Sequence, residues 1–589
     1  MRVKTVKSRH GSISYSIIRD IKKPDGTRST EVVVNLGNHT QLQEKCPDMD
    51  PMDYARQIAK EMTEAEKKGQ VTLVQKYDMT RLTSLNQHNG HDIGYFFLDQ
   101  LFYQLKLDKV CDNIKKQTKV TFDLTEILKT LISTRILYPS SKRSSHALSQ
   151  HYFTPPQMEL HHVYRALDVL AEQSEAIQTA VYKQSCELVE RNTHVLYYDC
   201  TNFFFEIEEE DDFRRYGRSK EHRPNPIVQM GLFLDGSGLP LAFTIFPGNQ
   251  NEQPSLKPLE KRIIKDFQLS NLVICTDAGL SSAANRRFNT TKTRRFVTTQ
   301  SIKKMKKSLK DWALDRSGWK LAHLSPNHPD YGKEFHLDEI DQMDASKMYY
   351  KERWELAEIT KEERALHIKP FEERYVVTYS AKYQTYQETI RHRQVERATR
   401  KIHQRDPLKT RHPQSPSRFI KRTSVTKQGE QATDYYSINE SVIEEEARYD
   451  GFYCIATNLE GPVEDILSIN HQRFDIEKAF SELKGEFKSR PVYLSREERI
   501  QAHFLVCFLA LTIFRILQHQ LASHESIETI IRTLREMKVT RLDHAHFIPH
   551  YTRTLMTDKL HEHAGFRTDY ELIPKKALKK IEKNIRNRK

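Results

Sequence analysis

With 589 residues, the chain is too long for one hydrophobic core, so we expect several domains or one core with large insertions. Its composition is 38% hydrophobic and 29% charged, and no uncharged apolar run reaches the length of about 18 residues that spans a membrane. Lys and Arg exceed Asp and Glu by 14, which favours a polyanionic partner without identifying one.

The sequence shows neither a secretory signal nor a disulfide pattern. Its N-terminus, MRVKTVKSRHGS, lacks an apolar segment and a small-residue cleavage site. The 7 cysteines are scattered without a CxxC pair, so we expect neither a disulfide framework nor a zinc knuckle. These features predict a cytoplasmic protein that does not associate with membranes.

The N-terminal third predicts a small β unit followed by helices. Residues 1–50 alternate apolar and polar positions around a Pro-Asp-Gly turn at 24–26, which is typical of a β-hairpin. In residues 51–190, apolar positions recur every three or four residues, which indicates helices. Such helices can include a DNA-binding helix-turn-helix, although plain scaffold helices fit the pattern equally well.

Residues 191–300 predict the first half of an α/β domain. Three runs rich in aromatic and β-branched residues follow one another, HVLYYDCTNFFFEI, PIVQMGLFLD and LPLAFTIFPG. A short helix at about 255–267 then leads to LVICTDAG, a nearly continuous apolar run of the kind found in buried strands. Strand, hairpin, helix and buried strand together indicate an α/β fold.

Residues 301–449 predict a large insertion into this domain, because they are highly charged and contain one clear strand-like run, RYVVTYSAKY. The buried pattern returns in residues 450–521, which we expect to complete the core, and residues 522–589 predict a basic helical region. Within the insertion, residues 391–422 hold 11 Lys or Arg and 2 acidic residues. This composition fits a segment that contacts nucleic-acid phosphate, and it also fits a solvated loop. The side chains that we expect to make this contact are Arg391, Arg393, Arg397, Arg400 and Lys401.

Two aspartates stand out as candidate metal ligands. Asp199 lies within a strand of aromatic and β-branched residues, where a purely structural acid is costly to desolvate. Asp277 ends a buried run and precedes Ala-Gly, where a parallel strand leaves its sheet and ligands commonly gather. Carboxylates delivered from separate elements to one point are what paired divalent cations require. The alternative for each residue is an aspartate that caps a neighbouring helix.

A third carboxylate is expected from a helix near residue 477. Arg473, Glu477 and Lys484 lie four and seven residues apart and therefore share one helix face. An acid between two cations can hold a metal while its neighbours hold phosphates, but two ordinary surface ion pairs have the same spacing. Glu482 is the nearest competitor, although five residues from Glu477 it points to another side of the helix.

Four short motifs follow one another within residues 195–520. They are Asp199-x-Thr201, Gly248-Asn249-x-x-Glu252, Asp277-x-Gly279 and a helix with Arg473, Glu477 and Lys484. In this order the motifs resemble the DDE transposases of bacterial insertion sequences, in the branch whose ribonuclease-H-like core is interrupted by a largely β-stranded insertion before the last catalytic acid. The signature helix of that branch carries a tyrosine three residues before the arginine, where this chain has Asn470.

The resemblance implies a fold, a reaction and a set of partners. The fold is a ribonuclease-H-like mixed sheet flanked by helices. Asp199, Asp277 and Glu477 would hold two magnesium ions, for which manganese can substitute, while Arg473, Lys484 and Asn249 would contact DNA. The ends of the element would be cleaved and the freed 3′-hydroxyls joined to target DNA. The partners would be terminal inverted repeats, target DNA and a second copy of the chain, in a bacterial, nucleoid-associated setting.

Two other functions remain open at the level of sequence. A ribonuclease-H-like nuclease or resolvase would use similar acids but would cut DNA without joining it. A DNA-binding regulator derived from a transposase would keep the fold and lose the chemistry.

Overall fold

The computed structural model describes residues 1–8, 11–22, 28–67, 88–325, 327–340, 346–357, 367–403, 415–425, 433–522 and 525–587, with a few isolated positions between them. The contacts divide the chain into two compact units, Met1–Gln87 and His88–Lys589. The turn expected at residues 24–26 lies outside the described residues.

The first unit is a three-stranded antiparallel sheet covered by two helices. Its elements are β1 (Arg2–Lys7), β2 (Ile13–Lys22), β3 (Arg28–Asn38), α1 (His39–Lys45) and α2 (Pro51–Lys67). Tyr15 from the sheet packs with Leu42 of α1 and Ala55 of α2 in a small core. A third strand and two helices thus extend the hairpin that the alternating pattern predicts, because a lone hairpin has too little apolar surface to be stable.

The second unit is built on a ten-stranded mixed sheet with the order β11-β10-β12-β13-β16-β9-β8-β5-β6-β7. Its first half contains β5 (Val195–Phe204), β6 (Ile227–Asp235), β7 (Pro240–Pro247), β8 (Leu272–Thr276) and β9 (Arg294–Thr299). β5, β6 and β7 pair antiparallel, whereas β8 is parallel to β5 and β9 is parallel to β8. This arrangement confirms the expected ribonuclease-H-like mixed sheet.

The rest of the sheet comes from β16, at the return to the core, and from strands of the insertion. β16 (Phe452–Thr457) pairs antiparallel with β9, and β13 (Glu372–Tyr379), β12 (Tyr349–Leu356), β10 (Trp319–Leu321) and β11 (Glu334–Phe335) follow outward. The strand-like run RYVVTYSAKY is strand only to Tyr379, and its end begins a long helix. The other elements of the insertion are η3 (Ile302–Lys304), α11 (Lys307–Leu314), α13 (Ala381–His403), η4 (Pro416–Phe419), β14 (Ile420–Val425), β15 (Thr433–Ile438) and α14 (Glu440–Ala447).

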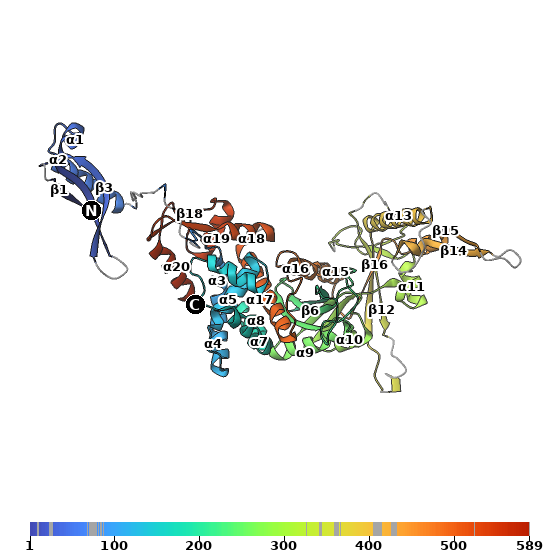
Figure 1. The fold of residues 1–589 in the computed structure, drawn as a ribbon. Helices are drawn as coiled ribbons and strands as arrows, with labels where there is room; N and C mark the ends of the chain where they lie inside the picture. Colours follow the sequence, from blue (N-terminus) through green and yellow to red (C-terminus); the bar gives the residue numbers. More distant parts are fainter. Residues whose placement is uncertain are drawn as a thin grey trace. The chain divides into compact units, whose positions relative to one another are not determined.

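Helices cover both faces of the sheet (Figure 1). α15 (Val463–Gln472) and α16 (Phe474–Lys484) pack on one face, in a core that also takes Tyr197 of β5 and Cys275 of β8. α9 (Leu256–Asp266) packs on the other face with Tyr198 and Ile274. Two shorter elements, η2 (Gln253–Ser255) and α10 (Ala283–Phe288), adjoin α9. Because side chains alternate along a strand, Asp199 and Asp277 share the face of Tyr197 and Cys275, under α15 and α16.

The apolar run near residue 502 forms α17 (Glu497–Leu521), at the centre of the helical part. By length and composition alone α17 could cross a membrane, but 94% of its most apolar window is buried inside the protein. The helices before β5 are α3 (Tyr95–Gln104), α4 (Leu107–Gln117), α5 (Leu124–Leu137), α6 (Lys142–Leu148), η1 (Ser149–His151), α7 (Leu160–Glu172) and α8 (Ser174–Leu188). Of these, α3, α5, α7 and α8 pack against α17.

The C-terminal region returns to these helices. Its elements are α18 (Ile527–Glu536), β17 (Lys538–Arg541), β18 (His546–Pro549), α19 (Leu555–Ala564), β19 (Ile573–Pro574) and α20 (Lys575–Asn587). β17 pairs antiparallel with β4 (Gly90–Asp92), which closes a small four-stranded sheet of order β19-β18-β17-β4. The two ends of the second unit are therefore joined by backbone hydrogen bonds.

Candidate active site

Asp199 and Asp277 lie side by side on neighbouring parallel strands. The register pairs Tyr198 of β5 with Thr276, the last residue of β8, so Asp199 and Asp277 each directly follow one member of this pair. Asp199 is only 9% exposed, and its Oδ1 accepts a hydrogen bond from the backbone N–H of Cys200 at 2.7 Å. Burial raises the pKa of Asp199 to about 6, and the negative charge of Asp277 adds to this shift, while Lys220 opposes it. The two acids therefore interact electrostatically in a partly desolvated place.

Glu252 is a further acid of this group that sequence reasoning quoted only as part of a motif. Burial raises its pKa, Lys220 opposes the shift, and the charge of Asp277 adds to it. Its carboxylate lies 4.0 Å from Nζ of Lys220, and its charge also raises the pKa of Asp199. The Gly-Asn-x-x-Glu spacing was the signal that could have identified Glu252 as a site residue.

Glu477 lies on α16, is 49% exposed, and pairs with Arg473 at 2.9 Å. One of the two ion pairs considered from the helix spacing is therefore present. Arg473 connects this pair to the aspartates, because the charges of Glu477 and Asp199 both raise its pKa against the effect of burial. Over the described part of the chain, no three His, Cys, Asp or Glu side chains converge closely enough to hold a metal ion. The structure brings Asp199 and Asp277 together, whereas Glu477 forms its ion pair with Arg473.

Lys484 faces the same place from the other end of α16. Burial lowers its pKa to about 8, the charge of Lys220 lowers it further, and Asp199 opposes the shift. Its Nζ lies 3.5 Å from Glu221, which also pairs with Arg490. The loop that carries Lys220 and Glu221 connects β5 and β6, and no sequence pattern marked it. The surroundings of the two aspartates therefore contain both cations and further acids.

Glu482, the competitor of Glu477, is directed elsewhere. It is buried and pairs with Arg515 of α17 at 2.8 Å. This position agrees with the argument from helix geometry that Glu482 points away from the face of Arg473 and Lys484.

Asn470, which stands where the signature helix has tyrosine, contacts a tyrosine from another element. Its Nδ2 donates to Oη of Tyr453 at 3.3 Å, and that hydroxyl lies 2.6 Å from Oγ1 of Thr299. Tyr453 also contributes to the raised pKa of Arg473. A tyrosine hydroxyl from β16 therefore lies next to the arginine of the signature helix.

The basic side chains expected to contact DNA differ in their surroundings. Arg391 is 13% exposed and pairs with Asp450 at 2.5 Å, which ties α13 to the start of β16. Arg393, Arg397 and Arg400 are exposed, and their spacing of four and three residues places them on one face of α13. Lys401 is half-buried. Asn249 is exposed after β7, and residues 404–414 of the basic segment lie outside the described residues.

Comparison with known proteins identifies the family. The family described as "Transposase DDE domain" matches residues 202–513, which is more than half of the chain and begins just after Asp199. No curated protein matches the sequence. Among solved structures, piggyBac transposase in a synaptic complex with hairpin DNA is similar at 9% sequence identity, with a TM-score of 0.35, over 83% of this chain and 85% of that chain. On the family match, this chain belongs to the DDE transposases and is a DNA transposase.

Proposed function

We propose that the protein cleaves the ends of a bacterial insertion sequence and joins the freed 3′-hydroxyls to target DNA, with Asp199, Asp277 and Glu477 as its catalytic acids. The observation that carries the proposal is the pair of aspartates on adjacent parallel strands, one of them with a raised pKa. The buried carboxylate of Asp199 is repelled by its ionised neighbour Asp277, and a divalent cation between them would relieve that repulsion.

The acids fit a hard divalent cation such as Mg²⁺, because carboxylate oxygens are its preferred protein ligands. Asp199 and Asp277 would hold it, and we propose Glu477 as the third acid on the strength of the signature helix. Glu252 is the alternative third acid, because it interacts electrostatically with both aspartates. Bound divalent ions, two in our proposal with Mn²⁺ as a substitute, would supply activation of the attacking oxygen and stabilisation of the departing 3′-oxygen.

The chain's own cations have a separate role in this proposal. Arg473 and Lys484 lie on either side of Glu477 along one face of α16, and both respond to the charge of Asp199. They would hold the phosphates that flank the cleaved bond, where charge builds up during the reaction. Asn249 and the exposed arginines of α13, Arg393, Arg397 and Arg400, would contact DNA further away. The terminal inverted repeats, a dimer in the DNA complex and a nucleoid-associated location belong to the same proposal.

The test is metal-dependent cleavage of a labelled duplex that carries the inverted-repeat end of the element. We expect nicking in Mg²⁺ or Mn²⁺ and joined products with target DNA. Asp199→Ala and Asp277→Ala should abolish both products and leave DNA binding nearly intact. Glu477→Gln and Glu252→Gln, compared in parallel, identify the third acid. Nicking without joining would replace the proposal with a nuclease or resolvase, and no nicking in either metal would favour a regulator.

A further inference from the structure

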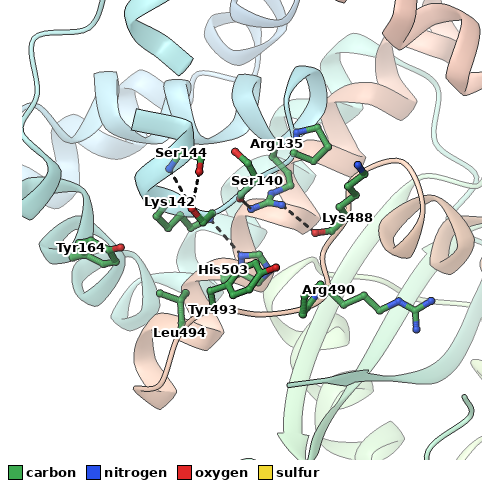
Figure 2. Close-up of a pocket in the computed structure, with 13 residues that line it drawn as sticks. Arg135, Ser140, Lys142, Ser144, Tyr164, Lys488, Arg490, Tyr493, Leu494 and His503 are labelled. Carbon is green, nitrogen blue, oxygen red and sulfur yellow. Dashed lines mark hydrogen bonds between the residues drawn. The ribbon is translucent and has the colours of Figure 1, made fainter. Parts of the chain in front are cut away.

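A cavity of about 530 Å³ lies between the turn that precedes α6 and the segment that follows α16 (Figure 2). Four of the side chains that line it are cations, namely Arg135, Lys142, Lys488 and Arg490. All lining residues belong to the described part of the second unit, and none of them is Asp or Glu. An excess of positive charge in a concave place concentrates anions.

Arg135 forms the buried wall of the cavity without an acidic partner. Its guanidinium donates to the backbone carbonyls of Phe487 and Lys488, both at 3.2 Å, and to that of Ser140 at 2.9 Å. Its Nε is buried and has no hydrogen-bond partner within the described chain. These bonds fix the guanidinium in place, and neutral carbonyls leave its charge uncompensated.

Lys142 is a second buried cation in the same wall, with only 4% of its surface exposed. Its Nζ lies 3.4 Å from Nδ1 of His503, and Nε2 of that histidine lies 3.1 Å from the carbonyl oxygen of Ser489. Because a carbonyl only accepts hydrogen bonds, Nε2 carries the proton and Nδ1 is free to accept from the lysine. Burial, and then the charges of Lys142 and Arg135, lower the pKa of His503 well below its ordinary value, which favours the neutral imidazole.

The burial of Lys142 beside Arg135 changes the pKa of the lysine. Burial lowers the pKa of Lys142 to about 7 and the charge of Arg135 lowers it further, while the buried thiol of Cys507 opposes the shift. Lys488 and Arg490 also line the cavity, from the segment after α16, although the guanidinium of Arg490 is directed away from it and pairs with Glu221 (Figure 2). An anion in the cavity would restore the charge of the lysine and compensate that of the arginine.

The cavity adjoins the candidate active site. Arg490 lines the cavity and pairs with Glu221, and Glu221 also lies 3.5 Å from Nζ of Lys484. Lys484 in turn responds to the charge of Asp199. A chain of charged side chains thus leads from the two aspartates to the cavity, so that a DNA strand at the aspartates would have its backbone near the cavity mouth.

We propose that this cavity is a phosphate-binding site, held by Arg135, Lys142 and Lys488, that takes a backbone phosphate of the bound DNA. The choice of DNA as the source of the phosphate rests on the proposed function, whereas the binding of a phosphate group does not. Hydroxyl groups of Ser140, Ser141 and Ser144 line the same wall and add donors for phosphate oxygens. Such donors and cations in combination are typical of phosphate sites.

The test uses the full-length protein in EDTA, so that DNA is bound but not cleaved. Fluorescence anisotropy of a duplex oligonucleotide measures its affinity over a range of salt concentrations. We expect Lys142→Met and Lys488→Gln each to weaken binding by about 5- to 10-fold and to reduce the slope of log Kd against log salt by about 1. Lys116→Gln, at an exposed lysine of α4, is the matched control and should change neither quantity measurably.

Calorimetry provides a readout that a merely structural role of Lys142 would not change. At pH 8, the lysine with a pKa of about 7 is mostly neutral, so binding of a phosphate should take up about one proton. Heats measured in two buffers with different ionisation enthalpies reveal this uptake. We expect it for wild type and expect its loss in Lys142→Met. Equal proton uptake in both proteins would overturn the role of Lys142.

Inorganic phosphate distinguishes the two sources of the ligand. At matched ionic strength, phosphate should compete with DNA in wild type more than in Lys142→Met if the cavity takes the DNA backbone. Phosphate binding with unchanged DNA affinity in both variants would assign the site to a free phosphate. The site would be refuted if two variants, Lys488→Gln at an exposed residue and a folded Lys142→Met, both bound DNA with wild-type affinity and if added phosphate had no effect on that binding. None of these measurements involves cleavage, so their outcomes do not depend on whether the wild-type protein proves to cleave DNA.

Discussion

Replacement of Asp199 by Asn should stabilise the metal-free protein at neutral pH while it abolishes cleavage. The pKa of this aspartate is raised from 3.8 to about 6, chiefly by burial and secondly by Asp277. Because the folded state binds the proton more tightly than the unfolded state, ionisation above this pKa costs stability. At about 1.4 kcal/mol per pKa unit, the cost approaches 3 kcal/mol at pH 7.5. Asn lacks the charge, has nearly the same shape, and can accept the same hydrogen bond from the N–H of Cys200.

The dependence on pH distinguishes this cause from better packing. Below pH 3.8 the aspartate is protonated in both states, so wild type and Asp199→Asn should be equally stable there. The difference should grow as pH rises from about 4 to about 6 and should then stay constant. Chemical denaturation followed by tryptophan fluorescence measures it, because Trp312, Trp319 and Trp354 all lie in the second unit. Asp311→Asn, at an exposed aspartate of α11, is the control and should have little effect.

Added Mg²⁺ completes this experiment. Saturation to 100 times the Kd should stabilise wild type by about 2.7 kcal/mol, because the ion binds the folded state only. Asp199→Asn should gain much less. The reasoning fails if Asp199→Asn is no more stable than wild type at pH 7.5, or if the difference persists unchanged at pH 4.

Three further predictions follow from the site and the insertion. Glu477→Gln should lower the rate of strand cleavage by about 100-fold or more and leave the affinity for end DNA within a factor of two or so, as measured with a labelled duplex; a cleavage rate near wild type would move the third acid to Glu252. Arg391→Ala should destabilise the second unit by about 3 kcal/mol, measured by denaturant unfolding, because it leaves Asp450 buried without its partner. Arg397→Gln, on the exposed face of α13, should instead weaken DNA binding without loss of stability. Tyr453→Phe removes the hydroxyl between Thr299 and Asn470 and should destabilise the unit by about 1 kcal/mol, with a slower cleavage rate if the hydroxyl helps to orient Arg473. Unchanged stability in Tyr453→Phe would mean that these hydrogen bonds contribute nothing.

The sequence predicted those parts of the fold in which a residue pattern fits only one type of secondary-structure element. The apolar runs that became β5 and β8 are buried on both faces, so they read as strands regardless of their neighbours. Asp199 and Asp277 stood out because each interrupts or ends such a run. Their proximity follows from the parallel register, which the alternation of strand and helix already indicated. This half of the candidate site was therefore accessible from sequence.

Residues that act through loops and charge were not accessible in the same way. Lys220 and Glu221 lie in the long connection from β5 to β6, where no periodicity indicates which side chains return to the aspartates. The helix α13 is polar on most of its surface, so its sequence looked like a charged insertion and not like a helix. A run of basic residues also does not indicate which arginine has an acidic partner, and only the fold pairs Arg391 with Asp450.

The position of the insertion explains how acids so far apart in sequence can serve one site. The chain leaves the core after β9 and returns as β16, and the pairing of Thr299 with Ile455 makes these two strands neighbours. The segment between them therefore closes on itself, and the entropic cost of a longer closed segment grows only with the logarithm of its length. α15 and α16 follow β16, next to β9, and return over β8 and β5. There the charge of Asp199 acts on Arg473 and Lys484. The insertion can thus vary in size and in DNA contacts without moving the signature helix away from the two aspartates.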